Sequence, residues 1–218
     1  MKRIILIFMS LIMIFSFAAC NKGAGDKKAE DNNSGDISAV TVTPAEIEQK
    51  IAAAVGSENY LCDTEIDKDW LQNSFGLDLS KVESYSAKQN SISSVNPDTV
   101  IVLKTKDGYA NEAAEILNTS FEQMVGYIRQ YPFGAEKVLN ARLYQSGDYV
   151  IYVIAGASYD GDDAEAEAKL AVAEYEKIDE AIEGIFGALP ENLAVALEDD
   201  GSAGGLTVPD DDTPVLGG

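Results

Sequence analysis

The chain has 218 residues, 46% of them hydrophobic, and its 37 acidic and 16 basic side chains give a formal net charge of −21. This charge repels phosphate backbones, so we expect no nucleic-acid partner. The sequence contains no histidine, which removes the commonest general base and the usual ligand of catalytic zinc, so we expect no enzyme of those classes.

The first twenty residues predict a secretory signal that ends at an attachment site for lipid. Met1-Lys2-Arg3 is basic, residues 4–17 are apolar apart from two serines, and small residues precede Cys20. This order is typical of a signal peptide. It resembles the lipobox of bacterial lipoproteins, although Phe17 stands where lipoboxes most often carry Leu. The resemblance implies removal of residues 1–19 and acylation of Cys20, with palmitate-type chains as a stable anchor.

This segment has two other interpretations. An uncleaved membrane-spanning helix needs about 20 apolar residues, and the apolar run here is shorter and is followed at once by Asn21 and Lys22. Secretion with a free thiol at Cys20 is the other alternative. With Cys20 assigned to lipid, Cys62 has no partner for an intramolecular disulfide, and we expect it to be a buried, unreactive residue.

Residues 20–43 are interpreted as the lipidated cysteine and a flexible tether, because Gly, Lys, Asp, Asn and Ser dominate the stretch. Thr43, Pro44 and Glu46 then form the start pattern of a helix, which Gly56 ends. A second short helix is expected at 67–74. Residues 82–88 and the β-branched run 99–105 predict two strands.

A long helix over 109–130 is the centre of the predicted fold. Apolar residues recur every three or four positions, which predicts a continuous buried stripe: Ala113, Leu117, Phe121, Met124, Ile128 and Tyr131. A hairpin of strands 138–145 and 149–155 follows, with its turn at 146–148.

An acidic cluster at 160–163 precedes a last helix over 163–186. A calcium loop would need oxygen ligands where Ala164 and Ala166 stand, so we interpret the acids as complementing the helix dipole. The buried face of this helix is expected to carry six residues: Ala168, Val172, Tyr175, Ile178, Ile182 and Ile185. Residues 189–218 are acidic and rich in Gly and Pro, which predicts a disordered tail.

The order of elements is helix, helix, strand, strand, helix, strand, strand, helix. Because adjacent strands favour antiparallel pairing, we predict an α+β domain over 44–188, with a mainly antiparallel sheet of about four strands and helices packed on one face.

Several short motifs carry a resemblance to a known family: Val82-Glu83-Ser84-Tyr85, Asp98-Thr99-Val100-Ile101-Val102, Tyr131-Pro132 and Gly147-Asp148-Tyr149-Val150. Residues 44–188, which hold these motifs, resemble a family of uncharacterised bacterial lipoproteins, a domain of unknown function found mainly in Gram-positive anaerobes. The lipobox before them agrees with this resemblance. The resemblance implies no assigned activity and no catalytic residues.

We therefore expect a membrane-anchored extracytoplasmic lipoprotein at the outer face of the cell membrane, attached to lipid through acylated Cys20. The sequence favours a non-enzymatic module that binds a protein or glycan partner or helps to organise the envelope. No catalytic residue, metal ligand or cofactor is identified. Two alternatives stay open: a hydrolase of envelope glycans that uses two carboxylates facing each other across a pocket, and an acidic cation-binding lipoprotein.

Overall fold

A five-stranded antiparallel sheet forms the centre of the computed structural model, which describes residues 41–93, 96–130 and 134–194. The strand order is β1-β2-β3-β5-β4, and every neighbouring pair is antiparallel. The strands are β1 Thr64–Glu65, β2 Val82–Gln89, β3 Thr99–Thr105, β4 Arg142–Ser146 and β5 Tyr149–Ile154. The predicted α+β class is confirmed. The short β1 is a fifth strand that was not expected.

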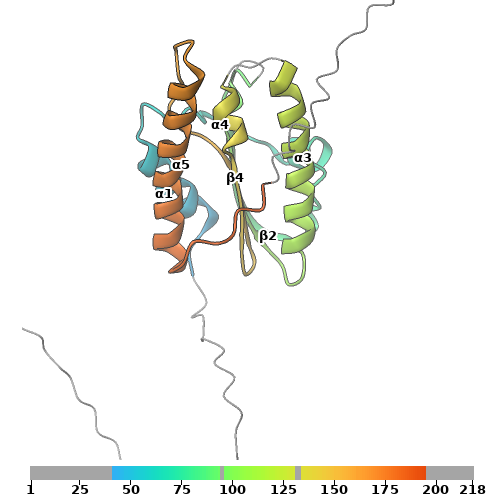
Figure 1. The fold of residues 1–218 in the computed structure, drawn as a ribbon. Coiled ribbons are helices and arrows are strands. Elements are labelled where there is room, and N and C mark those ends of the chain that lie inside the picture. Colours follow the sequence, from blue (N-terminus) through green and yellow to red (C-terminus); the bar gives the residue numbers. More distant parts are fainter. Residues whose placement is uncertain (1–40, 94–95, 131–133, 195–218) are drawn as a thin grey trace, which may run out of the picture. The chain divides into compact units, whose positions relative to one another are not determined.

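Helices cover both faces of this sheet, so the prediction that they pack on one face is wrong. Figure 1 shows α1 (Pro44–Val55) and α5 (Ala164–Phe186) on one side and α3 (Ala110–Gln130) on the other. In β3, Val100 and Val102 pack with α1 and α5, whereas Ile101 and Leu103 pack with α3. The neighbouring strand β5 is likewise buried along its whole length. Because helices cover both of its faces, its residues are apolar or aromatic at every position.

The long helix α3 presents its apolar stripe to the sheet. Phe121 is fully buried, and its ring meets that of Tyr152 on β5 edge to face at 6.4 Å between centroids. Met124 is half-buried, and Val125 is fully buried instead. The remaining stripe residues that the structure describes are buried as predicted: Ala113, Leu117 and Ile128.

The first helix begins as its sequence predicts. The Thr43 hydroxyl accepts a hydrogen bond from the Glu46 amide at 3.2 Å, and the Thr43 amide donates to the Glu46 carboxylate at 2.8 Å. This reciprocal pair satisfies two amides that the first helical turn leaves free. The short helix α2 (Lys68–Asn73) begins in the same manner, with Asp67 as its cap.

Two details of the later elements differ from expectation. The predicted strand 138–145 begins instead as a short helix, α4 (Ala135–Leu139), and β4 starts only at Arg142. Residues 135–139 are mostly good helix formers, and Gly134, at φ 67°, starts them in a backbone conformation that glycine adopts readily. On α5, Val172 is 45% exposed, because the buried stripe is centred on Tyr175, Ile178 and Ile182.

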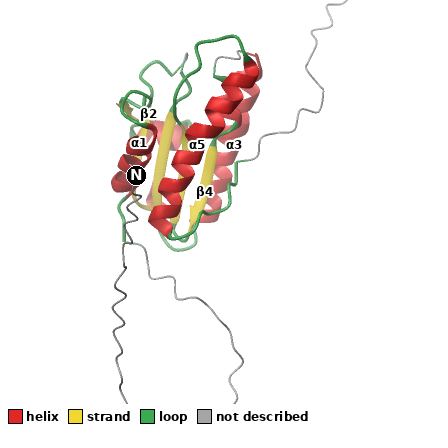
Figure 2. Ribbon diagram, turned by 60° about the vertical axis from the view of Figure 1, so that its left-hand side comes forward, coloured by secondary structure: helices red, strands yellow, loops and turns green. Residues whose placement is uncertain are grey.

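The chain after α5 returns to the outer edge of β4, beside which it runs in Figure 2. Leu193 donates its amide to the Leu143 carbonyl at 2.7 Å. The Asn192 side chain accepts from the Leu143 amide at 2.9 Å and donates to the Ala141 carbonyl at 3.1 Å. The packed chain thus continues past the expected tail boundary at residue 188. In the described ranges, every helix is too short or too polar to cross a lipid bilayer.

Candidate functional site

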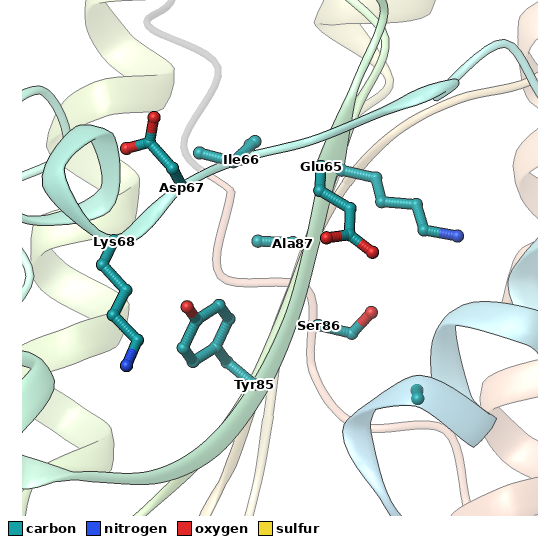
Figure 3. A pocket seen from close by; sticks show the side chains of 9 residues that line it. Glu65, Ile66, Asp67, Lys68, Tyr85, Ser86 and Ala87 are labelled. Carbon is teal, nitrogen blue, oxygen red and sulfur yellow. The ribbon is translucent and has the colours of Figure 1, made fainter.

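The outer edge of β2 borders a groove with a volume of about 720 Å³. This volume lies within the usual range of ligand sites, roughly 300–1,000 Å³. Figure 3 shows the groove, which we call the edge groove. It is lined by one residue of α1, the segment that leaves β1, and the middle of β2: Ala45, Glu65, Ile66, Asp67, Lys68, Tyr85, Ser86, Ala87 and Lys88.

The groove exists because β1 is much shorter than β2. Only Lys88 and Gln89 of β2 pair with β1, and the Ile66 amide adds one bond to the Ala87 carbonyl at 2.9 Å. Asp67 then accepts a hydrogen bond from the Trp70 amide at 2.7 Å, and the chain turns into α2. The rest of the outer edge of β2 is left uncovered by β1.

Only alternate residues of β2 turn their backbone groups toward the groove. Because the Ala87 carbonyl bonds outward to Ile66, the odd-numbered residues of β2 turn their amides and carbonyls away from β3. Tyr85 has this parity, and in the described part of the chain no strand lies opposite it on that side. Its amide and carbonyl are therefore available to a further strand.

The two sides of the groove carry different chemistry. Figure 3 shows Tyr85 and Lys68 on one side of β2, and Ser86 and Glu65 on the other. The side of Ser86 faces α1, where Lys88 bonds the buried Glu48 at 3.2 Å. Glu65 and Lys68 are exposed, and neither forms an ion pair within the described residues.

A second polar cluster lies inside the domain, where β3 begins. Lys137 on α4 bonds Asp98 at 2.8 Å, and the two residues are only 5% and 0% exposed. The Lys137 ammonium also donates to the Ser158 hydroxyl at 3.1 Å. The second carboxylate oxygen of Asp98 has no hydrogen-bond partner in the described ranges. Burial raises the pKa of Asp98, and the charge of Lys137 opposes that rise.

The loop after β5 brings Ser158 to this cluster. Gly156 has φ 124°, and a Cβ there would lie 2.9 Å from the Cβ of Glu174 on α5. A serine beside a lysine can act as a nucleophile only when the lysine is neutral and can accept the proton. Here the Lys137 amine is the hydrogen-bond donor to both the Asp98 carboxylate and the Ser158 hydroxyl. The arrangement favours a structural role.

Cys62 is 4% exposed, so the prediction that it is buried is confirmed. Burial raises the pKa of its thiol, and the negative charges of Asp98 and Glu48 add to the effect. The thiol is thus protonated at neutral pH and is a poor nucleophile. Asp163 caps α5, accepting from the amides of Glu165 and Ala166 at 3.0 and 3.2 Å. Cys20, the one predicted site residue, lies outside the described residues.

The edge groove and the buried pair were not expected from the sequence. Lys137 was part of no predicted motif, and Tyr85 was named as a residue of a predicted strand and of the family motif but not as part of a binding site. A two-residue strand such as β1 has no periodicity to detect. The Asp98 side chain meets Lys137 only through the tertiary fold, across 39 positions of sequence.

Residues 57–155 match the model of a family described as a domain of unknown function, DUF4358. The matched span holds all five strands with α2, α3 and α4, and leaves out α1 and α5. The resemblance to an uncharacterised family is thus confirmed for a span narrower than residues 44–188. No curated protein and no solved structure matches the chain.

Proposed function

We propose that this protein is a membrane-anchored extracytoplasmic lipoprotein that binds a partner without catalysis, and that the edge groove is its binding site. The anchor is Cys20, which follows a signal-type segment in the sequence. The single observation that carries the binding site is the open edge of β2 beside a groove of about 720 Å³ with charged, hydroxyl and aromatic groups on its walls.

The groove offers little support for the hydrolase alternative. Of its two carboxylates, Asp67 is engaged as the cap of α2, and Glu65 lies on the side of β2 that faces α1. A glycosidase needs both carboxylates free to flank one glycosidic bond. The acidic cluster near Asp163 gives equally little support to cation binding, since that carboxylate accepts two amides of the first helical turn.

Site-specific photo-crosslinking in living cells tests the proposed binding site. A photoreactive amino acid replaces Ser86 in the groove of the full-length protein, and in a matched control it replaces the exposed Glu180 on α5. We expect a discrete adduct from position 86 and none from position 180. Equal labelling at both positions, or no adduct at 86, would overturn the assignment of the groove as the binding site.

A further inference from the structure

We propose that the occupant of the edge groove is an extended polypeptide segment of a partner protein, which adds to the sheet as a strand beside β2. This inference rests on the proposed function and specifies the class of its ligand. Addition of a strand to an open sheet edge is a common mode of peptide recognition, in which backbone hydrogen bonds supply affinity and alternate side chains supply specificity.

The backbone of β2 presents outward hydrogen-bonding groups to which such a strand could bond. The Tyr85 amide and carbonyl point away from β3, and the sheet plane continues from β1 until Asp67 leaves it. An added segment would lie in line with β1 and occupy the places opposite Ser86, Tyr85 and Ser84. A bulge between Val82 and Ser84 interrupts the regular register of β2 with β3 and limits the site to a few residues.

The charges on the two sides predict the side chains of the segment. Successive residues of a strand point to opposite faces. A residue placed opposite Tyr85 therefore points to the side of Lys68, and its neighbour points to the side of Glu65. Because Glu65 and Lys68 are exposed and form no ion pair within the described residues, the best ligand carries an acidic side chain on the first side and a basic one on the second.

The other edge of the sheet is partly covered by the described chain. Asn192 and Leu193 already pair with the outer edge of β4. These contacts cover the backbone of Leu143 at the start of β4, whereas the described chain gives Tyr85 in the middle of β2 no such cover. Lys88, which also lines the groove, is already paired with Glu48 and leaves Glu65 as the acid that faces the ligand.

Binding of synthetic heptapeptides to the full-length protein in detergent micelles, followed by fluorescence anisotropy, tests the inference. The lead peptide is rich in Val and Thr and carries Glu and Lys at adjacent central positions. We expect N-methylation of the alternate amides that face β2 to weaken binding about five- to tenfold for each hydrogen bond lost. Methylation of the amides on the other edge should leave binding unchanged, since those amides face solvent.

Variants of the protein give the matched controls. Tyr85→Pro removes the outward amide without breaking a bond to β3, because that amide points away from β3. It should abolish peptide binding, whereas Tyr85→Val, which keeps the amide, should retain it. Where Tyr85→Pro does not fold, the charge exchange Glu65→Lys with Lys68→Glu serves instead, and this variant should prefer the peptide with Glu and Lys exchanged.

Four kinds of result would overturn the inference. One is loss of affinity by the same factor on methylation of either edge, or the same peptide preference after the charge exchange. The second is a gain in peptide affinity of tenfold or more on deletion of residues 21–40, which would show that the protein's own tether occupies the edge. The third is dimerisation through β2 that the peptides do not compete with. Crosslinking of a glycan or lipid at position 86 without peptide binding would also overturn it, and would leave the proposed function standing.

Discussion

Lys137 Nζ lies 2.8 Å from Asp98 Oδ1, and the pair joins the short helix α4 to the start of β3 inside the protein. Removal of one partner from a buried ion pair leaves an uncompensated charge, which costs about 3–5 kcal/mol. We expect Lys137→Met to lower the free energy of unfolding by about this amount at pH 7. Denaturant unfolding of both proteins measures the difference.

The loss in Lys137→Met should depend on pH. Burial raises the folded-state pKa of Asp98, so the stability from this group is fully present below the unfolded pKa, about 3.9, and is lost as pH rises through the folded pKa. Without Lys137 the folded pKa rises further, so the deficit should be small near pH 4 and should grow toward pH 7. The double variant Asp98→Asn with Lys137→Met should recover most of the loss. An equal deficit at both pH values would contradict this account.

Phe121 on α3 is fully buried against Tyr152. Phe121→Ala should lower the free energy of unfolding by about 3–5 kcal/mol, through lost burial and the cavity that remains. Val172→Ala is the matched control, because Val172 on α5 is 45% exposed, and its effect should stay within about 0.5 kcal/mol. A loss below about 1 kcal/mol for Phe121→Ala would be inconsistent with a fully packed site.

Two changes near the C-terminus should have opposite outcomes. Deletion of residues 199–218 should leave the thermal midpoint unchanged or raise it slightly, because the segment is acidic and rich in Gly and Pro. Asn192→Ala should lower the free energy of unfolding by about 1–3 kcal/mol, since its amide group bonds Leu143 and Ala141. Thermal and denaturant unfolding measure both effects. A marked fall in the midpoint on deletion of 199–218 would show that this segment stabilises the domain.

Cys20→Ala tests the anchor. Without the thiol there is no attachment point for lipid, so the protein should appear in the medium or remain unprocessed. Cell fractionation and the mass of the N-terminal peptide report the result. A variant that is processed as wild type and stays with the membrane fraction would refute the lipoprotein assignment.

The sequence predicted best those elements whose signals are local. The bounds of α1 and α5 follow from Thr43 and Asp163 as caps and from the helical period of the apolar residues, and β3 was predicted over its full range. Each of these features depends on neighbouring residues alone.

The features that sequence analysis missed depend on contacts between distant segments. The apolar run of β5 predicts a central strand. It does not predict that α1 and α5 pack together over one face of the sheet, because that contact joins segments far apart in the sequence. The groove forms because the chain leaves the sheet at Asp67, after only two residues of β1 have paired with β2. The sequence of this segment does not indicate that pairing. No local pattern indicates that Asp98 and Lys137 meet.

The coverage of β4 by Asn192 and Leu193 has a consequence for assembly. A sheet with one accessible edge can accept one strand, and growth then ends. A chain shortened at residue 190 would expose β4 as well as β2, so that β2 of one copy could pair with β4 of the next. Such a head-to-tail contact does not close on itself and repeats without limit. We therefore expect the pairing of Asn192 and Leu193 with β4 to hinder such end-to-end association of copies.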